Sequence, residues 1–272
     1  MHSPAFQALS REMALANQIV GSGLTVIRDA DLSKNGSYSE AFFNLSIGLE
    51  RMGKLIFIID HCYSNQGTFP TDKELRNFGH NLISIIQHAK KVREKYPTND
   101  SLANWDDSDI GAAILNCLSQ FADGTRYFNL DFITNGKTKQ SVDPVKLWYE
   151  TVIKPVLNKH YSKEAREKDA LQARIMGDLM RDISIVRFTA EDGRSINRFD
   201  DLTLHAHTGK IGNKWAQLYL LRIVRFLSVL LNDLGYKAYE LRYDFIPHTS
   251  DFFGRFYNDD KYFKTRKGRK TT

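Results

Sequence analysis

The segment from about Tyr38 to Tyr63 constrains the fold most, because apolar residues occur on almost every side of it at helical spacing. A helix that is apolar all round is stable only when neighbouring elements cover it. Gly48 and Gly53 lie within this segment, and at each of them another backbone could approach closely. We therefore expect a helical bundle with this segment at its centre.

Helical periodicity extends over most of the chain. Thr71 and Glu74 have the spacing of a capping box, Pro144 suits the first turn of a helix, and Pro155 should kink or end the helix that contains it. The predicted helices span residues 4–29, 38–63, 71–96, 107–122, 143–161, 163–189 and 213–235. The predicted fold class is all-α, a helical bundle with a few short strands in the C-terminal third, at residues 186–188 and 239–245.

The chain of 272 residues is long enough for one large domain or two modest ones. A division is predicted near residue 162, with a helical bundle over 1–162 and a C-terminal helical region over 163–260. No flexible linker marks this point, so a single continuous domain remains the alternative. Residues 261–272 form a basic tail.

This tail carries the whole formal net charge of +6, since it contains six lysines and arginines and no acid. Such a tail is expected to be solvated, because like charges repel and carry no core. The alternative is that it binds phosphates of RNA or DNA. The candidate nucleic-acid-binding residues are Lys264, Arg266, Lys267, Arg269 and Lys270.

Most nucleotide hydrolases, dehydrogenases and serine hydrolases are excluded, because the sequence lacks their motifs. It has no phosphate-binding Gly-Lys loop, dinucleotide-binding fingerprint or nucleophile elbow, so no cofactor is expected. His205 and His207 have no third ligand nearby, so no metal site is predicted either. Cys62 and Cys117 lie among apolar residues, as buried thiols do in a reducing compartment. With neither a signal peptide nor a membrane span expected, we predict a cytoplasmic protein.

A polar stripe interrupts the apolar central helix. Glu50, Lys54 and His61 follow one another at steps of four and seven residues, which places them on one face. Glutamate four residues before lysine favours an ion pair. The stripe is either a structural pair that fixes the packing of the helix or a polar site inside the bundle.

Arg76 and His80 form a second candidate pair, four residues apart within the predicted helix over 71–96. On one helix face, the arginine could stabilise the charge on a reacting phosphate while the histidine moves the proton of an RNA 2′-hydroxyl. The alternative is that His80 only hydrogen-bonds a carboxylate and packs in the bundle.

Three segments, SIGLERMGKLIFIIDH, ELRNFGHNLISII and GTRYFNLD, together resemble HEPN-type bacterial proteins, including abortive-infection relatives. The resemblance covers about residues 38–133. It implies a helical bundle that is frequently dimeric and, in active members, cleaves RNA without a metal. Such members use arginine and histidine separated by four to six residues, and the resemblance makes Arg126 and Asp131 further candidate site residues.

That spacing occurs only at Arg198 with His205 and at Arg242 with His248, and the composition alone produces about two such pairs by chance. Arg242 and His248 lie in a segment rich in aromatic residues near the basic tail. Bases could stack there, or the aromatic rings could pack against the bundle.

Two functional hypotheses follow. The first is an RNA-acting HEPN-like protein, a metal-independent endoribonuclease of antiviral defence or of a toxin system, with RNA as its partner and a homodimer as its form. The second is a catalytically inactive helical protein that binds a protein or nucleic-acid partner.

Overall fold

The computed structural model describes residues 2–31, 33–34, 36–98, 100–105, 107–134, 142–266 and 268. Over these residues the protein is all-α, as predicted, with one two-stranded antiparallel sheet. The elements, in chain order, are α1 (Pro4–Arg28), α2 (Ser37–Ser64), α3 (Asp72–Phe78), α4 (Leu82–Lys95), η1 (Ser101–Ala103), α5 (Asp109–Asp123), η2 (Thr125–Tyr127), α6 (Phe128–Ile133), α7 (Pro144–Trp148), η3 (Tyr149–Ile153), α8 (Lys154–His160), α9 (Lys163–Met180), β1 (Phe188–Thr189), β2 (Ser195–Ile196), α10 (Phe199–Glu240), α11 (Ser250–Phe253), η4 (Gly254–Phe256) and α12 (Asp260–Thr265).

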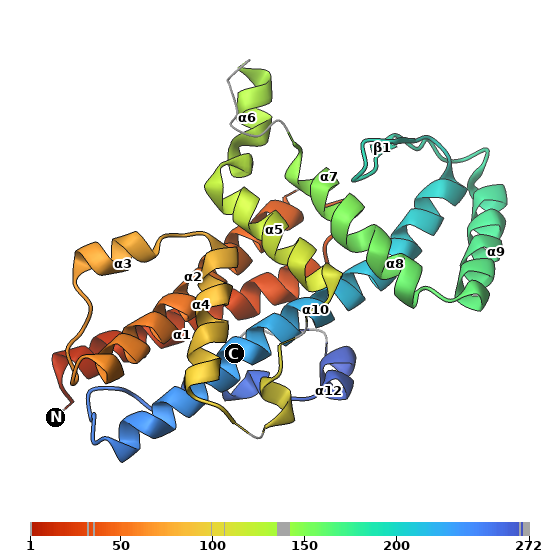
Figure 1. Cartoon of the computed structure of the whole chain (residues 1–272). Coiled ribbons are helices and arrows are strands. Elements are labelled where there is room, and N and C mark those ends of the chain that lie inside the picture. The colour runs from red at the N-terminus through yellow and green to blue at the C-terminus, as the bar shows by residue number, and fades with distance from the viewer. Residues whose placement is uncertain are drawn as a thin grey trace.

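Helix α2 is the centre of the bundle, which confirms the prediction from its apolar pattern. It packs against α1, α4, α5 and α10 (Figure 1). Leu45, Met52 and Ile56 of α2 are fully buried. Because a buried apolar side chain contributes about 1.5 to 3 kcal/mol, these contacts hold the surrounding helices together.

The two glycines of α2 mark close approaches, as predicted. A Cβ atom built on Gly48 would lie 3.2 Å from the backbone nitrogen of Val20 in α1, and one built on Gly53 would overlap Ile85 of α4. The absence of a side chain at each position therefore lets α1 and α4 lie directly against α2.

The single helix predicted over residues 71–96 is wrong, because the chain breaks at Gly79. The predicted capping box of Thr71 and Glu74 is present and begins α3. Gly79 then takes a φ of +77°, which ends the helix, and the side chain of Asn81 caps a second helix, α4. The apolar period of α4 continues that of the preceding residues, so the pattern alone did not show the break.

The helix predicted over 163–189 is also wrong, since α9 ends at Met180. The chain then forms a hairpin in which Phe188 pairs with Ile196 and Thr189 with Ser195. Asp192 and Gly193 are part of the connection between these strands, where Gly193 has a φ of +86°. The predicted strand over 186–188 is thus correct in part, displaced by about two residues.

Helix α10 is longer than predicted and runs without a break through residues 199–240. Asn213, where the helix was predicted to begin, lies inside it, and its side-chain amide nitrogen donates to the carbonyl oxygen of Ala30. Gly212 and Gly235 lie inside the helix, against Ile153 and Thr249. The predicted strand over 239–245 is wrong, because its first two residues end α10 and the rest form turns.

Pro155 does not end its helix. It lies in the first turn of α8, directly after the π-helical turn η3 that joins α7 to α8, and α8 continues to His160.

The main core extends from Leu9 to Phe263 and includes α10, so residues on both sides of the predicted division at 162 share one core. The basic tail begins within the fold. Phe263 of α12 is 1% exposed, which corrects the expectation that the whole tail is solvated. Within the described ranges, no helix is both long and apolar enough to cross a membrane.

Candidate functional site

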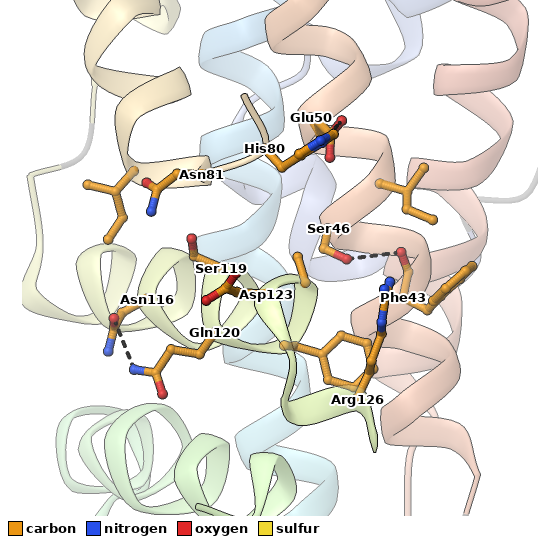
Figure 2. Close-up of a pocket in the computed structure, with 14 residues that line it drawn as sticks. Phe43, Ser46, Glu50, His80, Asn81, Asn116, Ser119, Gln120, Asp123 and Arg126 are labelled. Carbon is orange, nitrogen blue, oxygen red and sulfur yellow. Dashed lines mark hydrogen bonds and ion pairs between the residues drawn. The ribbon is translucent and has the colours of Figure 1, made fainter. Parts of the chain in front are cut away.

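A cleft of about 530 Å³ lies between α2, the start of α4, α5 and η2 (Figure 2). It brings together three residues predicted for different reasons: Glu50 of the polar stripe, His80 of the second pair and Arg126 of the segment GTRYFNLD. Its floor is partly apolar, with Phe43, Ile47, Ile83 and Phe121 among the residues that line it. The volume is within the range of ligand sites in proteins.

One carboxylate oxygen of Glu50 contacts two side chains. The Lys54 ammonium lies 2.7 Å from Oε1, and Nδ1 of His80 lies 2.9 Å from the same atom. The side chains of Glu50 and Lys54 are only 19% and 22% exposed, whereas that of His80 is 77% exposed. The predicted Glu50–Lys54 pair therefore exists, and it also anchors a histidine from another segment.

The backbone around Gly79 positions His80. The left-handed φ of Gly79 would strain any residue with a Cβ atom, and it turns the chain from the end of α3 back towards α2. Asn81 follows as the N-cap of α4, accepting a hydrogen bond from the backbone amide of Ser84 at 3.0 Å. His80 is thus held between two helices, with one ring nitrogen on Glu50.

Arg126 lies across the cleft from His80, in the short helix η2 (Figure 2). Its guanidinium lies 4.9 Å from the centre of the Tyr127 ring. The side chain is exposed, and no ion pair within the described residues restrains it. A cation in this position is available to an anionic ligand.

The polar face of α5 completes the cleft and was missed by sequence reasoning. Asn116, Ser119, Gln120 and Asp123 line it, and Gln120 donates to Asn116 at 3.2 Å. Their spacing of three, four and seven residues on an otherwise apolar helix was a readable signal.

Other predicted site residues lie outside this cleft. Arg76 is on α3 and pairs with Asp72 at 2.9 Å, with 79% of its side chain exposed. Because α3 ends before His80, the prediction that Arg76 and His80 share one helix face is wrong. Asp131 lies on α6 and His61 near the end of α2, beside Phe57, and neither lines the cleft.

The Arg242–His248 segment follows α10 and does not contribute to the cleft. Both side chains are exposed, and the His248 ring is 6.0 Å from that of Tyr239. Tyr243 and Phe245 pack against the main core, as one of the two interpretations predicted.

The candidate nucleic-acid-binding residues of the tail fall partly within the fold. Lys264 of α12 lies 4.9 Å from the Trp215 ring centre, and Arg266 donates to the Tyr262 hydroxyl at 2.6 Å. Lys267, Arg269 and Lys270 lie outside the described residues.

A second polar cluster joins the hairpin to the bundle beside another cavity, of about 440 Å³. Glu191 accepts hydrogen bonds from the Tyr38 hydroxyl at 2.9 Å and from Nε2 of His205 at 2.6 Å. Burial raises the pKa of Glu191, but these hydrogen bonds and the charge of His205 outweigh burial, so its pKa is lowered overall. Burial and the Glu191 charge raise the pKa of Tyr38.

The two histidines considered as metal ligands are directed to different acids. His205 contacts Glu191, and His207 lies 3.4 Å from Asp169. Across the described part of the chain, no group of three or more histidine, cysteine, aspartate or glutamate side chains is arranged to hold a metal ion.

The first cleft therefore combines a carboxylate–histidine pair, a guanidinium that forms no ion pair among the described residues, a second carboxylate from Asp123 and neutral hydrogen-bonding groups. A carboxylate on one ring nitrogen of a histidine orients the ring and raises the basicity of the other nitrogen. Such a set can move a proton next to a bound anion. Comparison with known proteins gives no match, since no family model, no curated protein and no solved structure is similar to the chain.

Proposed function

We propose that this protein acts on RNA through the first cleft, as a metal-independent endoribonuclease of a bacterial defence or toxin system, working in the cytoplasm. The observation that carries the proposal is the hydrogen bond of 2.9 Å between Glu50 and His80 in a cleft that also contains Arg126. The resemblance of residues 38–133 to HEPN-type proteins supports the same proposed function.

In this mechanism His80 is the base. With Nδ1 donating to Glu50, Nε2 carries the lone pair and accepts the proton of a ribose 2′-hydroxyl. The 2′ oxygen then attacks the neighbouring phosphorus, and the bond from phosphorus to the 5′ oxygen breaks. The leaving 5′ oxygen takes a proton from solvent. Water can enter the cleft because the His80 side chain is exposed. The products are a 2′,3′-cyclic phosphate and a 5′-hydroxyl.

Arg126 has a separate role. Its guanidinium can donate two parallel hydrogen bonds to the non-bridging phosphate oxygens, which gain negative charge as the 2′ oxygen attacks. The amides of Asn116 and Gln120 can hold the sugar or base of the same nucleotide.

The test is incubation of the purified chain with labelled structured RNAs, transfer RNA included, in the presence of EDTA. We expect cleavage with cyclic phosphate ends. His80→Ala should lower the rate by about 100- to 10,000-fold and Arg126→Ala by about 100- to 1,000-fold. Cleavage unchanged in both folded variants would refute the site.

Two further arginine variants sharpen this test. Arg11→Ala removes an exposed arginine of α1 and is the matched control for Arg126→Ala, with unchanged cleavage expected. Arg76→Ala separates the two site assignments, because it leaves the rate unchanged if Arg126 holds the phosphate and abolishes cleavage if Arg76 does. Binding of RNA without cleavage by the unaltered protein would favour the inactive binding protein.

The basic tail is proposed to add affinity for the RNA backbone. Deletion of residues 266–272 retains Phe263 in the core and removes four of the six tail cations. We expect weaker RNA binding with a shallower dependence on salt, because fewer counterions are released. An unchanged salt dependence would exclude the deleted residues from the interface.

A further inference from the structure

The apolar stripe of α9 faces away from the molecule. Leu171, Ile175 and Leu179 are 58%, 50% and 67% exposed. The inner face of α9 instead contains Ala173 and Gly177, which lets α10 approach closely, since a Cβ atom on Gly177 would lie 3.2 Å from the backbone nitrogen of Asp200. The residues that gave α9 its amphipathic pattern are therefore on its outer side.

Helix α9 lies at the edge of the molecule, beyond the first half of α10 (Figure 1). The exposed apolar surface continues past the end of the helix, through Ile183 and Ile185, which are 76% and 87% exposed. Contiguous apolar surface of this kind on a folded protein marks a contact with another molecule.

The stripe is symmetric about Ile175. Four residues to either side lie Leu171 and Leu179, and seven residues to either side lie Lys168 and Asp182. At 100° per residue, all five positions fall within about 40° of one line along the helix. The helical winding continues beyond Met180, because the Ser184 amide donates to the Met180 carbonyl oxygen at 3.1 Å.

This symmetry matches a second copy of the same helix running antiparallel. With a two-fold axis at Ile175, Leu171 of each copy faces Leu179 of the other, and Lys168 faces Asp182. Opposite charges then meet at both ends of an apolar centre. Considering only residues that the structure describes, neither Lys168 nor Asp182 forms an ion pair within its own chain.

We propose that α9 is a homodimer interface, in which the helices of two copies pair antiparallel about Ile175. The partner is a second copy of this chain, because the apolar pattern and the charge pattern are both complementary to themselves in this one register. The proposal is independent of the RNA-directed function of the first cleft, which lies on other helices.

Sedimentation of the full chain tests the interface, over about 1 to 100 μM so that mass action can reveal a dimer. We expect a dimer, and we expect Ile175→Asp to raise its dissociation constant at least about 100-fold, because two carboxylates then meet at the centre of the contact. Leu130→Asp, which changes an exposed leucine of α6, is the control and should remain dimeric. Circular dichroism confirms that each variant is folded.

Exchange of the end charges tests the register. Lys168→Glu or Asp182→Lys alone places like charges together at both ends and should weaken the dimer about tenfold, whereas the two together should restore it. A monomeric unaltered protein would overturn the proposal and leave the surface to a different partner. A dimer that survives Ile175→Asp, or a double variant that stays as weak as the single ones, would also overturn it.

Discussion

Replacement of Gly48 by alanine tests whether the contact between α1 and α2 is as close as the structure has it. Alanine is favoured over glycine inside a helix by about 1 kcal/mol, so Gly48→Ala should stabilise α2 if space allowed it. The new Cβ atom would overlap the Val20 side chain and lie 3.2 Å and 3.3 Å from the backbone nitrogen and Cα of Val20. Because backbone cannot rotate away, α1 must shift.

Overpacking of this kind costs about 1 to 3 kcal/mol, so the net effect of Gly48→Ala is a loss of up to about 2 kcal/mol in the free energy of unfolding. Gly209→Ala isolates the packing cost. Gly209 also lies inside a helix, α10, and no atom is within 4 Å of its built Cβ. It should therefore stabilise the protein by about 1 kcal/mol.

The measurement is urea unfolding followed by circular dichroism, and the difference between the two variants gives the packing cost directly, since the helix propensity cancels. If Gly48→Ala stabilises the protein as much as Gly209→Ala does, the close contact of α1 with α2 is not present in solution.

Three further predictions concern titratable groups. Because the pKa of Glu191 is lower in the folded state, its charge stabilises the fold above about pH 4, the usual pKa of an unfolded glutamate, and this contribution is lost as the pH falls through the folded pKa. Glu191→Gln should therefore make the free energy of unfolding less dependent on acid pH. An unchanged dependence would contradict the burial of the Glu191–His205 pair. Asp260 binds two arginines of α10, so Asp260→Asn should lower the free energy of unfolding by about 2 kcal/mol, as measured by urea unfolding. A variant as stable as the parent would show that these ion pairs do not hold α12 in place. Burial raises the pKa of the Cys62 thiol to about 11, so a thiol reagent at pH 8 should modify it only after unfolding; rapid modification of the native protein would refute its burial.

The sequence predicted those elements whose pattern lies within a few residues or covers nearly every face of the helix. The apolar character of α2 required burial whatever surrounded it, and the Thr71–Glu74 capping box needed only its own turn. The break at Gly79 was not predicted, because glycine tolerates both a helix and a left-handed turn and the neighbouring apolar residues keep helical spacing on both sides.

The three residues of the candidate site were singled out in the sequence one by one, but not as an assembly. Glu50, His80 and Arg126 come from three separate segments. How close these side chains lie depends on how α2, α4 and α5 pack, and spacing along the sequence does not encode that packing. The stripe of α9 shows a further limit of pattern, since Leu171 and Ile175 have the period of a core face and yet are exposed, while Ala173 occupies the buried side.

The position of α10 in the chain affects how the protein folds during synthesis. The ribosome completes α2 at residue 64, but the part of α10 that covers the bundle is finished only near residue 238. At about 5 to 20 residues per second, the two events are separated by about 10 to 35 s. For that time the apolar surface of α1 and α2 that packs against α10 stays uncovered on the nascent chain, although α4 and α5 are already complete by residue 123.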